Sequence, residues 1–465
     1  MAQQHRAYPT RVPDRVEDDG RLHNWARNAT LGRAGSLTVP ADEDELRAFL
    51  GATSGTSRIL GTRMSPGRMI EAVDGGGALI DVQLLSGLVA LTHDSATFGG
   101  ATSLQEVYDV LSGHGRMLPS SPGVIATQTL AGAISTGTHG QGLQQGSIAD
   151  AVRAVRLVLA DGSVREFGED DPRFHAVALG LGSLGVITRV TLRTEPSVIY
   201  SCRKYAVDAD DLEARFEGWN RDSALLKAWW FVQEGQVQVW SARPAGEADV
   251  RRYHAGGDEL IEEQVSTDAM NEAVEQTLGR MRDDARTADA DYTPFRTVTR
   301  FRDFADVTGD VYQVFCRGIP APQINVEIAV PLARAAAAIS KIKKWYADTQ
   351  PRLHYPIILR CTGPSAAWLS PAHGQETCYF GFVVYYAEDG SLPAEGEAFL
   401  RQVEKLLAAE GGRPHWGKYF DESLYDWTAL YPRWRDFARV RAALDPGRRF
   451  GNTFTTALFD GPNRP

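Results

Sequence analysis

The feature of this sequence that most constrains its fold is an almost uncharged stretch of glycine, serine and threonine over residues 120–140. It reads SSPG and then, after three apolar residues, TQTLAGAISTGTHG. It contains neither the GxGxxG fingerprint of a Rossmann fold nor the GxxxxGK[ST] loop of nucleotide phosphatases. Its small residues and hydroxyls suit a buried row of donors pressed against a large, polar, planar ligand. On composition alone, an ordered loop that stabilises only itself is an equally good interpretation.

Length and charge narrow the class of protein. The chain has 465 residues, which favours two domains. Its net charge is −10 without a long run of Lys or Arg, so neither nucleic acid nor a membrane is an expected partner. No apolar segment resembles a signal peptide or a membrane span. Cys202, Cys316, Cys361 and Cys378 lie far apart, which argues against a metal site and favours a reducing cytoplasm.

The apolar pattern predicts an α+β chain with a domain boundary near residue 196. Before this boundary we expect short strands, two helices and a hairpin across Asp161-Gly162. The strands are expected at residues 37–40, 59–60, 78–82, 88–93, 97–98, 151–160, 163–167 and 186–193, and the helices at 42–50 and 104–112. After it, aromatic alternation over residues 228–242 predicts an antiparallel sheet with one covered face, and residues 258–284 are expected to be helical. From about residue 415 the chain is expected to return to the first domain.

Two short motifs outside the stretch are candidates for chemistry. GTRMSPG, residues 61–67, follows a short apolar strand, and successive amides in such a turn can bind pyrophosphate. HWGK, residues 415–418, places Lys418 beside aromatic residues, where its ammonium can face an anionic ligand. Taken alone, GTRMSPG is more simply explained as an ordinary turn, and HWGK as a surface lysine beside a core tryptophan.

Together these motifs resemble the vanillyl-alcohol oxidase superfamily of FAD-linked oxidoreductases, most closely its sugar-lactone and alditol oxidase branch. The resemblance covers nearly the whole chain. It is carried by NWARN (24–28), GTRMS (61–65), AGAISTGTHGQG (131–142), LGSLGVI (181–187), Trp229-Trp230, WLSP (368–371), HWGK (415–418) and LDPGRRFGN (444–452). It implies a two-subdomain FAD-binding domain in residues 1–195 and a cap domain in 196–414, built on an antiparallel sheet flanked by helices. It also implies a segment, 415–465, that returns to the FAD site.

The resemblance also implies a set of cofactor-binding residues. Backbone amides of the GTRMS turn and of the glycine-rich strip are expected to hold the pyrophosphate and ribityl groups of FAD. Backbone at the start of the strand 186–193 is expected to contact the adenine end. His139 is expected to serve backbone geometry more than proton chemistry. The set consists of Gly61, Thr62, Arg63, Met64, Ser65, Ser121, Gly123, Thr129, Gly132, Ser135, Thr136, Gly137, Thr138, His139, Gly140, Val186, Ile187 and Lys418.

One departure from the family concerns how the flavin is attached. Covalent members carry a histidine, bonded to the flavin 8α-methyl, at the position of Met64 in this chain. A thioether does not form that bond under ordinary conditions, but it packs well against ring methyls. No cysteine lies in the strip, and His93 and His114 do not match the motif. We therefore expect FAD to be held non-covalently.

Other departures concern catalysis. The branch carries Glu-x-Arg on a cap strand, and here Arg360 survives while Ile358 occupies the carboxylate position. Glu327, from an earlier strand, is one candidate substitute, although an ordinary solvated or ion-paired carboxylate is the simpler interpretation. Gly381 and Val383 stand where alditol oxidases present polar groups, which suggests a more apolar or bulkier substrate.

The function that follows is oxidation of a hydroxyl group on a sugar-like, polyol or lactone substrate, with hydride transfer to flavin N5. Arg360 is expected to anchor the substrate and Lys418 to stabilise developing negative charge. The general base stays open among Lys418, Glu327, Tyr379 and water, and the acceptor is O2 or another oxidant. Two alternatives are a dehydrogenase for a hydroxyl of a glycosylated or nucleoside-like metabolite, with an acceptor other than O2, and a non-redox FAD-binding protein.

Overall fold

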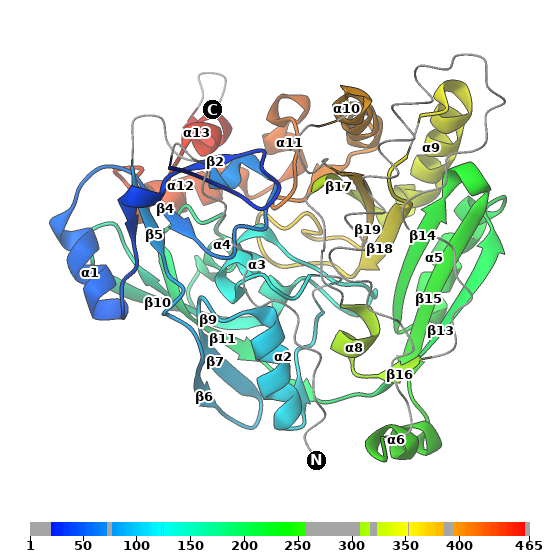
Figure 1. The fold of residues 1–465 in the computed structure, drawn as a ribbon, viewed down its shortest axis with the longest axis horizontal. Coiled ribbons are helices and arrows are strands. Elements are labelled where there is room, and N and C mark those ends of the chain that lie inside the picture. Colours follow the sequence, from blue (N-terminus) through cyan, green and yellow to red (C-terminus); the bar gives the residue numbers. More distant parts are fainter. Residues whose placement is uncertain are drawn as a thin grey trace.

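The computed structural model describes residues 20–71, 77–121, 123, 125–256, 307–316, 323–351, 353–385, 392 and 394–460. Within them the chain forms three larger sheets with helices packed on them, which confirms the α+β fold class (Figure 1). The helix expected over residues 258–284 lies outside the described part of the chain. No helix in that part is long and apolar enough to cross a bilayer.

The first sheet is parallel, with strand order β3-β5-β4. Its strands are β3 (Leu37–Thr38), β4 (Ser57–Leu60) and β5 (Ala78–Asp81). Helix α1 (Glu43–Ala52) begins where the Asp42 side chain accepts the Glu45 amide at 2.9 Å, and its acidic first turn suits the helix dipole. Leu46 and Leu50 of α1 then pack on Ile80 of β5.

The second sheet is antiparallel, with order β10-β9-β11-β7-β6. Its strands are β6 (Leu88–Leu91), β7 (Ser95–Gly99), β9 (Val152–Val158), β10 (Val164–Gly168) and β11 (Val186–Arg193). The predicted Asp161-Gly162 turn joins β9 to β10, with Gly162 at φ 79°. Two helices accompany the sheet, α2 (Leu104–Gly113) and α3 (Leu130–Thr136). Helix α3 was not predicted, and it lies inside the glycine-rich strip.

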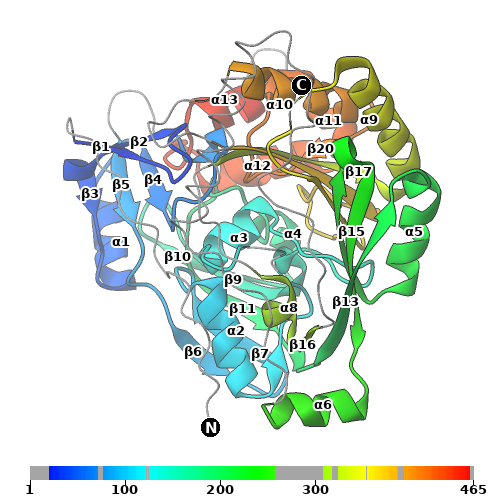
Figure 2. The same ribbon diagram turned by 45° about the vertical axis from the view of Figure 1, so that its right-hand side comes forward.

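The third sheet is antiparallel, with order β16-β13-β15-β14-β18-β19-β17-β20 in the described residues. Its strands are β13 (Tyr200–Asp208), β14 (Leu225–Phe231), β15 (Gln236–Pro244), β16 (Val307–Gly309), β17 (Gln323–Pro331), β18 (Ile357–Thr362), β19 (Thr377–Tyr385) and β20 (Arg413–Pro414). Figure 2 shows α5 (Leu212–Asp222) and α9 (Ala335–Thr349) on its outer side, and α10 (Ala394–Ala408) packs on β17 and β19.

The prediction of one covered face for this sheet is wrong at its centre. All nine residues of β19 are buried, as are all but the last of β17. The reason is that α9 and α10 cover one face while the glycine-rich strip of the first domain covers the other. On that second face the Tyr379 ring stacks on the His139 ring, with centroids 3.5 Å apart. We call it the site face.

The segment after residue 415 packs against elements from the N-terminal part of the chain. The Arg449 guanidinium donates to the carbonyls of Leu50, Thr53 and Ala160 at 2.7 to 2.9 Å. Helices α11 (Trp427–Leu430), α12 (Trp434–Leu444) and α13 (Thr453–Asp460) belong to this segment. The other strands and α-helices of the described residues are β1 (Arg21–His23), β2 (Thr30–Arg33), β8 (Arg116–Met117), β12 (Glu195–Pro196), α4 (Phe174–Val177), α6 (Glu247–His254) and α8 (Val311–Phe315).

Candidate active site

The predicted phosphate turn follows β4 directly. Arg63 holds a left-handed φ of 60°, which an ordinary side chain adopts only when its surroundings require it. The backbone amides of Thr62, Met64 and Ser65 donate no hydrogen bond to any residue that the structure describes. A concave run of such amides is a binding site for anionic oxygens. The turn therefore has the donors that a pyrophosphate requires.

Contacts from distant segments hold this turn in place. The Asn24 side chain donates to the Ser65 carbonyl at 2.8 Å, and the Ser65 hydroxyl donates to the Gly417 carbonyl at 2.8 Å. Gly67 has no space for a side chain, because a Cβ atom there would lie 2.7 Å from the Lys418 carbonyl oxygen. The turn and the HWGK motif are thus adjacent. Asn24 lies in the NWARN motif, but the sequence indicated no role for it.

Helix α3 brings most of the predicted strip residues together. Thr129 caps its start by accepting the Gly132 amide at 3.2 Å, and Gly137 ends it at φ 74°. The Thr129 hydroxyl also lies 2.7 Å from where a Gly61 Cβ would be, so helix and turn meet. The Thr136 hydroxyl donates within the helix to the Gly132 carbonyl at 3.0 Å.

Other predicted cofactor residues take structural positions. The Ser135 carbonyl accepts the Leu181 amide at 3.1 Å, and the Thr138 hydroxyl donates to the Gln128 side chain at 2.7 Å. Gly140 is required because a Cβ there would lie 2.0 Å from the Ser121 hydroxyl. Val186 and Ile187 begin β11, with side chains in the core and backbone paired to β9. Only their backbone is therefore suited to contact a cofactor.

Cross-strand register places the predicted catalytic residues in two neighbouring rows of the site face. In one row Arg360 of β18 is opposite Tyr379 of β19. In the next row Ile358 is opposite Gly381, which is itself opposite Glu327 of β17. Residues directly opposite in an antiparallel pair point to the same side of the sheet. A carboxylate, that of Glu327, therefore lies in the same row as Ile358, two strands along.

Glu327 and Arg360 form a buried ion pair on this face. The Arg360 guanidinium also donates to the His139 carbonyl at 3.4 Å. It needs Gly123 beside it, because a Cβ atom on that residue, which has φ 71°, would lie 2.0 Å from Nη1 of Arg360. On its other side the Glu327 carboxylate lies 3.4 Å from Nε2 of His139. Strip and sheet thus meet at this carboxylate.

The HWGK motif, residues 415–418, contributes the last side chains of the cluster around Glu327. The His415 amide donates to the Glu327 carbonyl at 2.9 Å, while Nδ1 of His415 accepts the Gly417 amide at 3.0 Å. Lys418 lies close enough that its charge acts on Glu327. The sequence motif contained His415, but no role was predicted for it. Its place is set by the pairing of β20 with β17, which the sequence does not show.

Electrostatics set the protonation of this cluster. Burial alone would raise the pKa of Glu327, but the charge of Arg360, the neighbouring His139 ring and the charge of Lys418 hold it well below its usual range. Burial lowers the pKa of Lys418, against the attraction of Glu327. Burial likewise lowers the pKa of His415 to about 3, so this ring is neutral at pH 7. The resting cluster therefore contains one carboxylate, one guanidinium and a lysine that gives up its proton more readily than usual.

The same residues do not form a convincing cation site. Potential ligand atoms of His139, Glu327 and His415 lie within 4.8 Å of one another. Arg360 already donates to the Glu327 carboxylate, however, and Lys418 adds a second positive group. A metal ion would be repelled by both. The net positive charge favours an anionic or electron-rich ligand instead.

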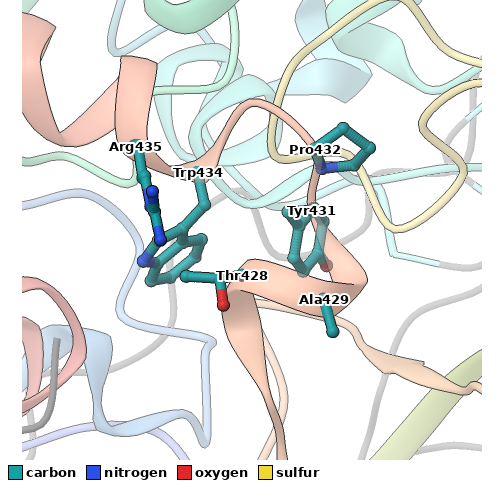
Figure 3. A pocket seen from close by; sticks show the side chains of 6 residues that line it. All are labelled: Thr428, Ala429, Tyr431, Pro432, Trp434 and Arg435. Atoms are coloured by element: carbon teal, nitrogen blue, oxygen red, sulfur yellow. The ribbon is translucent and has the colours of Figure 1, made fainter. Parts of the chain in front are cut away.

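A separate cavity of about 360 Å³ lies in the tail segment (Figure 3). It contains none of the predicted site residues. Its lining consists of Thr428, Ala429, Tyr431, Pro432, Trp434 and Arg435. The same segment also contains stacked aromatic rings, including Trp416 on Trp427 with centroids 5.2 Å apart.

Comparison with known proteins identifies the family. Residues 36–168 match an FAD binding domain, and residues 190–458, more than half of the chain, match D-arabinono-1,4-lactone oxidase. The chain is 28% identical to an alditol oxidase from a Streptomyces species, over 94% of this chain and 99% of that one. It is 26% identical to an L-gulono-1,4-lactone dehydrogenase from Mycobacterium tuberculosis, over 85% and 91%.

The fold also matches a solved structure, a cholesterol oxidase from B. sterolicum, with a TM-score of 0.73 at 14% identity. That match covers 97% of this chain and all of the other. The two family models account for the two parts of the molecule, the strip and turn in the first and the site face in the second. The chain is therefore an FAD-dependent oxidoreductase that acts on CH–OH groups and belongs to the D-arabinono-1,4-lactone oxidase family.

Proposed function

We propose that this protein holds FAD non-covalently between the turn, the strip and the HWGK motif, and oxidises a carbinol of a polyol or sugar-lactone substrate. The observation that carries the proposal is the buried Glu327–Arg360 pair, which lies on the site face beside Lys418. The activities of the similar alditol oxidase and L-gulono-1,4-lactone dehydrogenase support the substrate class. The division at residues 195 and 414 is part of the proposal, because β12 and β20 fall at these points.

Each charged residue has a distinct task in this proposal. When bound, FAD accepts the hydride from the substrate carbon. Glu327 accepts a hydrogen bond from the substrate hydroxyl, and Arg360 fixes that carboxylate while binding a neighbouring oxygen. The Lys418 ammonium stabilises the negative charge that develops as the hydroxyl loses its proton. Glu327 and Arg360 are buried and Lys418 is half-buried, which strengthens these interactions because water screens them less.

The rest of the row points to a substrate with an apolar part. Trp229 of β14 is opposite Ile358. The Ile358 side chain covers Gly381, since a Cβ atom on Gly381 would lie 3.3 Å from Cβ of Ile358, so apolar surface extends along the row toward Glu327. Val383, one row further, is opposite Asn325. A carbinol held at Glu327 would therefore lie beside apolar surface on one side. A polyol or lactone with a deoxy or alkyl substituent would bury that part here.

Anaerobic reduction of the flavin tests the proposed function. Alditols, aldonolactones and alkyl-substituted analogues are mixed singly with the protein, and bleaching of the flavin absorbance is recorded. We expect at least one class to reduce the flavin in a single turnover. Dithionite reduction without reduction by any of these substrates would contradict the proposal. Mixing the reduced protein with O2 or a quinone then separates an oxidase from the dehydrogenase alternative. Membership of a redox family argues against the non-redox alternative.

Non-covalent attachment has a direct test. The turn carries Met64, while His93 and His114 are exposed on other elements. We therefore expect acid precipitation to release the flavin into the supernatant, with the pellet colourless and the protein at its unmodified mass. Flavin that stays in the pellet would contradict the proposal. All four cysteines are buried and none forms a disulfide, which supports our proposal of a cytoplasmic location.

A further inference from the structure

His139 has one ring nitrogen with no hydrogen-bond partner, and this nitrogen faces the Glu327 carboxylate. Nδ1 of His139 lies 3.0 Å from the Gly140 carbonyl oxygen, which can only accept, so Nδ1 carries a proton. In the neutral ring Nε2 then has a lone pair, 3.4 Å from the Glu327 carboxylate oxygen. Nε2 is buried, and its approach to the Glu327 carboxylate lacks the geometry of a hydrogen bond. Two acceptors therefore face each other with no proton between them.

We propose that His139 and Glu327 form a dyad that takes up the proton of the substrate hydroxyl. This inference rests on the proposed function and adds where the proton goes. The hydroxyl O–H bond breaks, the proton passes to Glu327, and it is held on Nε2 of His139 in a hydrogen bond to the carboxylate. The carbon–hydrogen electron pair leaves as hydride to the flavin, so the carbinol becomes a carbonyl. His139 acts through Glu327 and is a positioning residue.

The surroundings of the ring are built for a temporary positive charge. The His139 ring stacks on Tyr379 with centroids 3.5 Å apart and planes at 17°, and an aromatic face attracts a cation. Opposing this, burial and the charge of Arg360 lower the pKa of His139, although Glu327 acts in the other direction. Lys418 and His415 face the same carboxylate, and the charge of Asp150 acts on Tyr379. The ring therefore starts neutral and can also release the proton again.

The experiment is the pH dependence of single-turnover flavin reduction in two variants. His139→Asn can keep the donor to the Gly140 carbonyl but removes Nε2. His139→Gln can place an amide donor near Glu327 but cannot take up a proton. In the wild-type protein the rate falls at low pH as the dyad becomes protonated before substrate binds, with an apparent pKa that belongs to the pair. In both variants we expect a plateau about 100-fold lower.

The acidic limb is the pH range in which the rate of flavin reduction falls toward low pH. Its position distinguishes a role of His139 in proton uptake from a purely structural role. In both variants only Glu327 can accept the proton, and its low pKa should move the limb to lower pH by about one unit or more. Tyr379→Phe, which keeps the stacking, should leave the limb in place. An unmoved limb in His139→Asn, or recovery of rate and limb in His139→Gln, would overturn the dyad. Absence of flavin reduction in the wild-type protein would instead contradict the proposed function itself.

Discussion

Replacing Glu327 with glutamine should slow single-turnover flavin reduction by about 10²- to 10⁴-fold, the range that general-base groups contribute. Glutamine has nearly the same shape but cannot accept the hydroxyl proton. It also leaves Arg360 and Lys418 without their shared carboxylate. Breaking a buried pair in this way typically costs about 3–5 kcal/mol, so a lower melting temperature is expected too. Stopped-flow absorbance and thermal melts measure the two effects, with FAD content checked from the spectrum.

The row of the site face offers a matched control for this variant. Ile358 lies in the same cross-strand row as Glu327, with Gly381 between them. Adding Ile358→Glu to Glu327→Gln returns a carboxylate to the row beside Arg360. We expect flavin reduction in the double variant to be at least tenfold faster than in Glu327→Gln alone. A Glu327→Gln protein that keeps FAD and reduces it at the wild-type rate would remove Glu327 from the chemistry.

Lys418→Ala should slow flavin reduction by tenfold or more, the scale of losing one electrostatic contact to developing charge. The ammonium is the only group in the HWGK motif that offers such charge, because the neighbouring His415 is neutral. Single-turnover reduction at saturating substrate measures the effect.

The control for this prediction is Lys418→Arg, which keeps the charge but places it with different geometry. It should fall between the wild type and alanine. Equal rates for wild type and Lys418→Ala would show that the ammonium does not stabilise the reaction. Loss of FAD in the alanine variant would instead assign Lys418 to cofactor binding.

The local parts of the fold were predictable because each depended on nearby residues. The helix that follows Asp42, the apolar run of β9 and the Asp161-Gly162 turn all appear where they were expected. Helix α3 was missed because it has only seven residues, and Gly132, Ile134 and the final Ser-Thr pair are poorer helix formers than its alanines and leucine. It forms because Thr129 caps it and buried Leu130 and Ile134 pack in the core. Tertiary packing, absent from any local pattern, decides this element.

The candidate site was partly predictable for the same physical reason. The motifs identified Arg360 and Lys418, but an ion-paired or solvated Glu327 was the simpler interpretation of its sequence. The carboxylate is indeed ion-paired, yet it is buried against the strip rather than solvated. Its partner lies on a strand two places away, and the register that joins them depends on β19 between them. The continuous apolar run of β19 is typical of a strand that is buried on both faces, as the structure shows β19 to be.

Because the C-terminal segment packs against N-terminal residues, folding during synthesis has to occur in a fixed order. Arg449 bonds the Ser57 hydroxyl across 392 residues of chain, and Arg58 donates to the Phe450 carbonyl over the same separation. The N-terminal domain therefore cannot reach its final packing until the ribosome has translated nearly everything after it. Until then, the apolar surface that Phe450 covers on α1 and β5 stays open to water or to a chaperone. A nascent chain stalled inside the cap domain should be sensitive to protease in its first 195 residues.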